Sequence, residues 1–437
     1  MLSYRITMFQ SKVAAKIVAP IASRAYASVA SAPVVSTANG IKVAAVAGNS
    51  DSPLASVSLV INAGSRFETS ESAGAAHYLK AFGFRNTQTR TSFRTVREAE
   101  LNGATLTAET TRENITYTVQ CFKEAVPYFV EVLGDIAAAT KFAEHEFKDV
   151  AQLVGFESLS ARSDPMSRAL DGIHQAAFRS GLGNSLYALE SSPVSSGDAV
   201  RQYAQSALAP GRIAIVATGV DAQELANLVS SSRLSSLVTP ASALSSPAAS
   251  FTGGVQQIYD SASPVSHYAL AFASEPASAQ SLAALLGAQS RIKWSSGVLP
   301  LAKLAATDGF GIAPFSFAYS DAGLVGVIVS APNTRIKAAV EKVAATIQRE
   351  IASASGEAIQ RAAAAARVDV AESLATQQGQ IHALSNIALG QTAATLESVD
   401  DAAAKLSSAA ARVFKSKPVA VSIGLSQNTP YVDTLGF

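Results

Sequence analysis

Two parts of the chain carry the same succession of hydrophobic patterns. In each part a β-branched segment predicts a strand, a helical segment follows, an alternating segment predicts a second strand, and an amphipathic segment predicts a second helix. These segments are 56–64, 71–83, 114–120 and 123–139 in the first part, and 266–273, 277–289, 322–329 and 333–351 in the second. Each part then closes with a helix and a strand, within 198–219 and 401–424.

The spacing between the matching segments is nearly constant. The first strands, the second strands and the closing glycines, Gly219 and Gly424, are separated by 210, 208 and 205 residues. Any alternation of strands and helices looks self-similar, but offsets this constant favour an internal duplication. A repeat this long, with several strands and helices in each copy, is a domain, because solenoid repeats run to roughly 20–50 residues. We therefore predict an α+β fold made of two homologous domains.

A change of composition separates the two parts. Residues 230–254 are rich in Ser, Pro, Ala and Gly and contain a single charge, Arg233. Such a composition is typical of a linker. We predict an N-terminal domain over 27–229, a linker over 230–254 and a C-terminal domain over 255–437.

The overall composition excludes several classes of protein. The chain has 437 residues, of which 48% are hydrophobic and 15% charged, so it is not a disordered chain. The 34 Lys and Arg residues are balanced by 33 Asp and Glu residues, which argues against a nucleic-acid partner. Cys121 is the only cysteine, so no disulfide framework or cysteine-based zinc module is possible within the chain. No run of 18 uncharged apolar residues occurs, and we expect the excess hydrophobicity to lie in packed helices and large contact surfaces.

The charge balance hides an asymmetry at the N-terminus. The first acidic residue is Asp51, whereas residues 1–26 carry four basic residues among Ser and apolar residues. A basic, acid-free segment that can form an amphipathic helix is typical of a mitochondrial presequence; the alternative is a basic tail of no consequence. The sequence Arg24-Ala25-Tyr26-Ala27-Ser28 resembles a matrix processing site, and we predict cleavage after Tyr26.

One helical segment carries an incomplete metal-binding pattern. The order Gly74-Ala75-Ala76-His77-Tyr78-Leu79-Lys80-Ala81-Phe82 resembles the inverted zinc motif H-x-x-E-H, in which two His residues one helical turn apart bind zinc and the Glu acts as general base. His77 keeps the first ligand position. Lys80 stands in place of the general base, and Ala81 in place of the second His.

The wider context resembles the pitrilysin family of peptidases over residues ~35–437. The segments that carry the resemblance are 63–68, 98–104, 110–113, 162–165, 174–179, 183–187 and 319–324. The family implies two homologous domains, each a mainly antiparallel sheet packed against helices. It places the third zinc ligand, a Glu, at Glu157. The Arg and Tyr pattern that clamps substrate in the second domain of active members is missing from residues 291–311.

These departures determine the expected chemistry. A catalytic zinc needs three protein ligands and a water, and at most two ligands, His77 and Glu157, remain. The ammonium group of Lys80 would repel a divalent cation and cannot accept a proton from water at neutral pH. We therefore expect no zinc, no other cofactor and no peptidase activity.

Some family members that lack the zinc motif are subunits of mitochondrial complexes. The chain resembles most the core subunits of ubiquinol–cytochrome c reductase (complex III), at Ser163-Asp164-Pro165, 181–185 and Trp294-Ser295. This resemblance implies a structural subunit, peripheral to the inner membrane on the matrix side. It would pair with the other core subunit and support cytochrome b and the Rieske iron–sulfur subunit in a dimeric complex.

Two alternatives stay open. The first is the non-catalytic, alpha-type subunit of the mitochondrial processing peptidase. Those subunits carry a long glycine-rich loop, whereas Gly287, Gly297, Gly309 and Gly311 are isolated here. The second is a solitary inactive homologue that binds matrix peptides.

The other candidate residues have plainer interpretations. We expect His145, within Glu144-His145-Glu146, to lie on a solvated helix face, and His174, His267 and His382 to be structural. We expect Cys121 to be a buried thiol and Trp294 to anchor packing or an interface.

Overall fold

The computed structural model describes residues 34–37, 40–47, 52–238, 244–287, 294, 299–392 and 395–437. The predicted presequence 1–26, with its cleavage site at Tyr26, lies outside the described residues.

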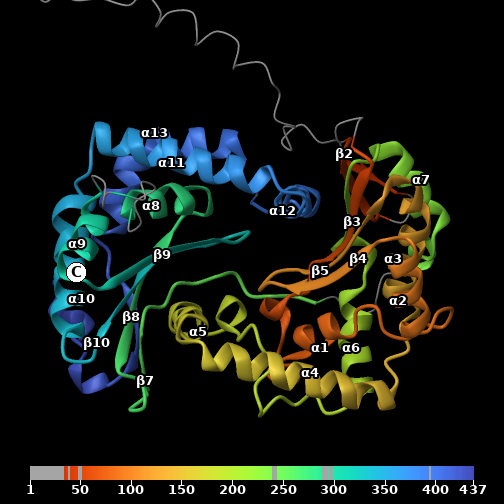
Figure 1. Cartoon of the computed structure of the whole chain (residues 1–437), viewed down its shortest axis with the longest axis horizontal. Coiled ribbons are helices and arrows are strands. Elements are labelled where there is room, and N and C mark those ends of the chain that lie inside the picture. The colour runs from red at the N-terminus through yellow and green to blue at the C-terminus, as the bar shows by residue number, and fades with distance from the viewer. Residues whose placement is uncertain are drawn as a thin grey trace, which may run out of the picture.

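The first half of the molecule is a six-stranded sheet with helices against it (Figure 1). Its strands are β1 (Val34–Ser36), β2 (Lys42–Val46), β3 (Leu54–Ile61), β4 (Thr105–Thr110), β5 (Ile115–Phe122) and β6 (Ile213–Thr218). Its helices are α1 (Ala75–Ala81), α2 (Ser92–Leu101), α3 (Val126–Ala139), α4 (Glu144–Ser163), α5 (Pro165–Phe178), α6 (Gly197–Ala207) and α7 (Ala222–Ser231), followed by the 3-10 helix η7 (Arg233–Ser236).

The second half is built in the same way on a five-stranded sheet. Its strands are β7 (Val255–Tyr259), β8 (Val265–Ser274), β9 (Gly311–Ala318), β10 (Gly323–Pro332) and β11 (Val419–Gly424). Its helices are α8 (Ala279–Leu286), α9 (Pro300–Asp308), α10 (Ile336–Thr346, continued by the π-helix Ile347–Ile351), α11 (Glu357–Leu374), α12 (Gln377–Leu389) and α13 (Leu396–Val413). None of the described helices is both long enough and apolar enough to cross a membrane.

The two sheets have the same strand order, which confirms the predicted duplication. The orders are β1-β2-β6-β3-β5-β4 and β7-β11-β8-β10-β9, so that β2, β6, β3, β5 and β4 correspond to β7, β11, β8, β10 and β9. In each sheet the first and last strands of the duplicated unit pair in parallel, β2 with β6 and β7 with β11, and the other described pairs are antiparallel. The α+β, mainly antiparallel prediction is therefore confirmed.

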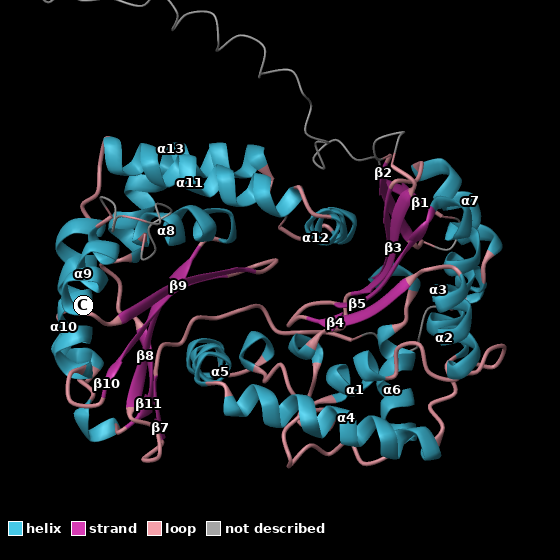
Figure 2. Cartoon of the chain, in the orientation of Figure 1, coloured by secondary structure: helices cyan, strands magenta, loops and turns pink. Residues whose placement is uncertain are grey.

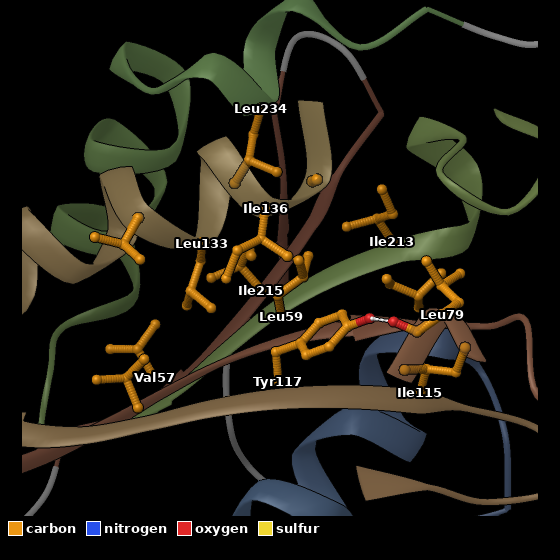
Figure 3. Close-up of a cluster of buried hydrophobic side chains, with 14 of the residues drawn as sticks. Val57, Leu59, Leu79, Ile115, Tyr117, Leu133, Ile136, Ile213, Ile215 and Leu234 are labelled. Atoms are coloured by element: carbon orange, nitrogen blue, oxygen red, sulfur yellow. Dashed lines mark hydrogen bonds between the residues drawn. The ribbon is translucent and has the colours of Figure 1, made fainter. Parts of the chain in front are cut away.

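The main core of the first half lies between its sheet and the helices on one face (Figure 3). Strand residues with period-two spacing, such as Val57 and Leu59, meet Leu133 and Ile136 from α3. The one buried hydroxyl among the side chains labelled in Figure 3, that of Tyr117, donates a 2.7 Å hydrogen bond to the carbonyl oxygen of Leu79 on α1. Helix α1 is thereby tied to the sheet.

The predicted linker 230–254 begins inside the fold of the first half. Leu234 of η7 is fully buried in the first core, and Arg233 forms a 3.0 Å ion pair with the buried carboxylate of Asp135. Residues 244–254 then run without regular secondary structure to β7. The domain boundaries themselves remain predictions.

One helix of each half packs against the sheet of the other half. Helix α5, from the first half, packs its Ile173 and Ala177 against β8 and β11, and α12, from the second half, packs Ile381 and Leu384 against β2, β3 and β6. Figure 2 shows α5 beside the second sheet and α12 beside the first. This exchange covers the second face of both sheets, so the halves share their cores.

Candidate functional site

The site helix α1 is short, and its start is held by a carboxylate. Gly74, just before α1, has a φ of 91°, which favours glycine, and a Cβ there would lie 2.8 Å from the Cβ of Ala188. The Glu68 carboxylate accepts 2.8 Å hydrogen bonds from the N–H groups of Gly74 and Ala76. Burial raises the pKa of Glu68 to about 7. The two hydrogen bonds favour the ionised form and therefore lower the pKa, but their effect is smaller than that of burial. No pattern in the sequence predicted this role of Glu68.

Helices α1 and α4 bring three of the four predicted motif residues together. His77 and Lys80 are three residues apart on α1 and therefore share a face, and Glu157 faces them from α4. The Nε2 atom of His77 lies 2.5 Å from Oε2 of Glu157. The Nζ atom of Lys80 lies 2.7 Å from Oε1 and 2.8 Å from Oε2 of the same carboxylate.

The hydrogen bonds determine the protonation of His77. The backbone N–H of Ala188 donates to Nδ1 of His77 at 3.1 Å, so Nδ1 carries a lone pair. The proton of the neutral ring is then on Nε2, which donates to Glu157. The ring is almost completely buried and meets the edge of Tyr187 with ring centroids 5.5 Å apart.

The charges in the cluster favour one protonation state. Burial lowers the pKa of His77, and the Lys80 cation adds to this effect while Glu157 opposes it. Burial alone would raise the pKa of Glu157, but the hydrogen bonds from Lys80 and His77 bring it below its ordinary value. At neutral pH the cluster is therefore a carboxylate held by an ammonium group and a neutral imidazole.

The residues present do not fit a zinc ion. Ala81 is buried in the first core and offers no ligating atom. The ammonium group of Lys80 already takes both oxygens of Glu157, the place where a cation would bind. Within the described residues, no group of three or more His, Cys, Asp or Glu side chains is arranged to hold a metal. No catalytic step through a metal follows from this arrangement.

A second cluster joins the two halves beside the site. Arg66, just before α1, makes a bidentate contact with Asp321 of the second half, at 2.7 and 2.5 Å, and a 2.7 Å contact with Glu113. Glu113 also accepts a 2.6 Å hydrogen bond from the hydroxyl of Ser320. Arg66 and Glu113 are buried, and Asp321 is about one-third exposed.

The hydrogen bonds of this cluster lower the pKa of Asp321 below its ordinary value, with the bond from Arg66 as the largest cause. Burial alone would lower the pKa of Arg66, but Asp321 and Glu113 raise it. The family segments 63–68, 110–113 and 319–324 thus meet at the junction between the halves.

Three further contacts lie beside or across the junction. Arg112 forms a 2.6 Å ion pair with Asp171 and donates to the carbonyl oxygen of Leu182. The ring of His174, on α5, lies with Nε2 2.7 Å from the hydroxyl of Tyr319 in the second half. Burial raises the pKa of Tyr319 to about 12, so Tyr319 keeps its proton at neutral pH.

The remaining candidates lie away from the site. His145 and His382 are exposed, and His267 pairs with the hydroxyl of Ser330 at 2.8 Å. Cys121 is buried in β5, where burial raises its pKa to about 11, so it is a poor nucleophile. The side chain of Trp294 is 89% exposed and packs in no described core.

Comparison with known proteins matches both halves of the chain to one family. Residues 43–189 match the insulinase family, peptidase family M16, and residues 196–365 match the peptidase M16 inactive domain. A protein of Cryptococcus neoformans named cytochrome b-c1 complex subunit 2, mitochondrial, is 35% identical over 92% of this chain and 94% of its own length. The chain belongs to peptidase family M16.

Other M16 relatives bear the same or a related name. The proteins of Yarrowia lipolytica and Neurospora crassa with that name are 31% and 32% identical, each over 95% of its own length. A potato protein named mitochondrial-processing peptidase subunit alpha is 33% identical, but over only 48% of its length. A solved protease structure from Helicobacter pylori has a TM-score of 0.78 at 14% identity, covering 90% of this chain and 99% of that chain, and supports the fold alone.

Proposed function

We propose that the chain is a non-catalytic structural subunit of the mitochondrial cytochrome b-c1 complex, of the core protein 2 type. It sits on the matrix side of the inner membrane as a peripheral subunit and pairs with core protein 1. It supports cytochrome b and the Rieske subunit in a dimeric complex and binds no nucleic acid. Its contribution to electron transfer from ubiquinol to cytochrome c is assembly rather than chemistry.

One observation carries the non-catalytic part of the proposal. The ammonium group of Lys80 lies where an M16 peptidase would hold zinc, and it is paired with both oxygens of Glu157. A peptidase of this type needs zinc to polarise the attacking water and a base to take its proton. Lys80 and Ala81 leave this chain with neither.

The relatives support the assembly part. Three fungal proteins named cytochrome b-c1 complex subunit 2 align along at least 94% of their own lengths. The alpha-type processing peptidase subunit is the second candidate, but the potato relative aligns over about half of its length.

The surface of the first half also fits a protein that is covered by partners. Large apolar side chains are exposed on two of its helices, with Phe93 at 75% and Leu101 at 77% on α2, and Phe156 at 70% and Leu159 at 61% on α4. Apolar side chains in such numbers are typical of interfaces when they gather on one side of a molecule.

The proposal is tested by complementation. The full chain, with an affinity tag at its C-terminus, is expressed in a fungus whose own subunit 2 gene has been deleted. We expect the tagged chain to enter the complex with cytochrome b and to restore ubiquinol–cytochrome c reductase activity. A variant in which Phe156 and Leu159 are both replaced by Ser should enter less complex, whereas Lys148→Ser on the same helix should behave as the unaltered chain.

The second candidate, an alpha-type processing-peptidase subunit, is tested with the tagged chain from the same mitochondria. Mixed with a catalytic processing-peptidase subunit, the chain should not cleave a presequence peptide. Cleavage that depends on this chain, together with failure to associate with cytochrome b, would replace the proposed function with the processing-peptidase function.

A further inference from the structure

The described sheets have four edges, and three of them are protected against the addition of another strand. Strand β1 has only three residues. Strand β4 carries the charged Glu109, which is held by Gln378 at 2.7 Å, and β9 contains Pro314. Short length, charge and proline are the devices by which proteins block edge pairing. The fourth edge, β7, has none of them, because its sequence is Val-Gln-Gln-Ile-Tyr.

The outer side of β7 also presents free backbone groups. Ala420 N–H donates to the Gly254 carbonyl oxygen and Asp260 N–H donates to that of Gly424. In a parallel ladder this pattern directs the N–H and C=O groups of alternate residues, Val255, Gln257 and Tyr259, away from β11. Within the described residues β7 pairs with β11 alone. The side chains of Val255 and Tyr259 are 54% and 64% exposed beside this edge.

The duplicated half shows what such an edge accepts. Strand β2 is the counterpart of β7, and β1 pairs antiparallel with its outer side, with Val35 opposite Val43. The second sheet has no described strand at this position. Next to the start of β7, a groove of about 670 Å³ is lined by Gly253, Gly254 and Val255 and by Arg412 and Lys417. A strand antiparallel to β7 would continue past Val255 into this groove.

The described chain ends cannot supply this strand. Strand β1 already pairs in the first sheet, at the other side of the molecule from β7 (Figure 2), and the C-terminal Phe437 packs its ring on Phe272 with centroids 5.3 Å apart. Pairing of β7 with β7 of a second copy would use five residues on each side. A stable interface takes roughly 20–30 residues on each side, so neither this pairing nor a strand from another subunit is sufficient alone; a subunit of the same assembly is held beside β7 by its other contacts as well.

We propose that β7 is a docking edge for an extended segment of a different protein subunit, which adds antiparallel to it as a sixth strand. The incoming segment has at least five residues, is uncharged, and places apolar side chains opposite Val255 and Tyr259. Backbone hydrogen bonds to Val255, Gln257 and Tyr259 supply the affinity. The inference rests on the proposed assembly role and specifies one surface through which it acts.

The test compares backbone hydrogen exchange of residues 255–259 in the chain purified alone and in the assembly isolated from mitochondria. We expect exchange to be slower in the assembly by at least about 100-fold, because added strand hydrogen bonds protect amides. Gln257→Pro removes an outward N–H that makes no bond to β11, so its melting temperature alone should match that of the unaltered chain. In the assembly it should lose the protection and release one subunit, whereas the matched variant Gln257→Thr should do neither. If Gln257→Pro proves unstable, Gln257→Lys replaces it, because a charge also blocks the edge.

Each other outcome overturns the proposal. Equal exchange in both samples shows that the edge is free in the assembly, which leaves the proposed function standing. Protection of the chain alone that rises with its concentration identifies a second copy as the occupant. Protection that disappears when residues 1–33 are deleted identifies this chain's own N-terminal segment. A chain that is found in mitochondria only as a monomer removes both this inference and the proposed function.

Discussion

The two halves share one strand order, but the helix positions that hold the site in the first half carry different side chains in the second. Counted from the first residue of each helix, His77 and Lys80 on α1 correspond to Ser281 and Ala284 on α8. In the first half these positions hold a buried polar cluster with Glu157. In the second half Ser281 is completely buried and the neighbouring Leu285 is part of the core.

The two halves differ in whether these positions must hold charged groups. Burial disfavours a carboxylate that has no partner, and the partly buried Glu157 is stabilised as an anion by a neighbouring cation. In the first half Lys80 supplies that cation within hydrogen-bonding distance. In the second half the corresponding helix positions carry no charged side chain, only the buried Ser281 and the half-buried Ala284. The first half thus holds His77, Lys80 and Glu157 together as a hydrogen-bonded cluster.

The largest effect is expected where the halves meet. Arg66→Met leaves Glu113 and Asp321 without their shared cation. Because Arg66 and Glu113 are buried, we expect the free energy of unfolding to fall by about 3–5 kcal/mol in urea titrations. The matched variant is Arg412→Met, whose ion pair with Glu275 is exposed on both sides and should cost less than about 1 kcal/mol. Equal losses for the two variants would show that Arg66 does not hold the halves together.

A smaller effect is expected at the site itself. Lys80→Met removes the ammonium group from Glu157, whose side chain is 30% exposed and can regain water, so we expect a loss of about 2 kcal/mol. The control is Lys342→Met in the second half, which breaks the more exposed pair with Asp308 and should cost less than about 1 kcal/mol. A variant Lys80→Met as stable as the unaltered chain would mean that the ammonium group does not stabilise the cluster.

The smallest effect is a dependence of stability on pH. His77 and His174 have pKa values lowered by burial from the ordinary 6.5. Above pH 6.5 both states of the protein hold these rings neutral. Below it the unfolded state takes up protons first, so stability falls as pH falls, by at most about 1.4 kcal/mol per pH unit for each histidine. His174→Gln should reduce this slope between pH 6.5 and 5, measured by urea unfolding; an unchanged slope would contradict the assignment.

Glu68 should act in the opposite direction. Its pKa is raised from 4.5 to about 7, so the unfolded state loses the proton first and stability falls as pH rises between these values. Glu68→Gln should therefore make the free energy of unfolding less dependent on pH between about 4.5 and 7. Together, His174→Gln and Glu68→Gln separate the contribution of the histidine from that of the carboxyl.

The strands could be predicted from the sequence because their signal is local. The β-branched run at 56–64 and the alternation at 114–120 correspond to β3 and β5, with ends that differ by at most three residues. The partial motif also identified His77, Lys80 and Glu157 as neighbours, although that inference came from family resemblance and not from spacing alone.

The exchange of α5 and α12 could not be predicted, for a physical reason. A stripe of apolar residues such as Ile381 and Leu384 shows that a face is buried, but burial is not directional and does not say against which sheet. The roles of Arg66 and Glu68 were missed for a similar reason, since each depends on partners that only the folded chain brings near. The same limit applies to Leu234, which lies in a segment with the composition of a linker.

The zinc content of the chain shows directly whether Lys80 and Ala81 exclude the metal. The full chain and a Lys80→Glu, Ala81→His double variant are purified in the presence of zinc, dialysed and analysed by atomic emission. We expect the natural chain to retain almost no zinc, because Lys80 occupies the place of the cation and Ala81 removes a ligand. The double variant restores three ligands and a base on the same two helices and should retain about one zinc per chain. About one zinc per natural chain would contradict the account.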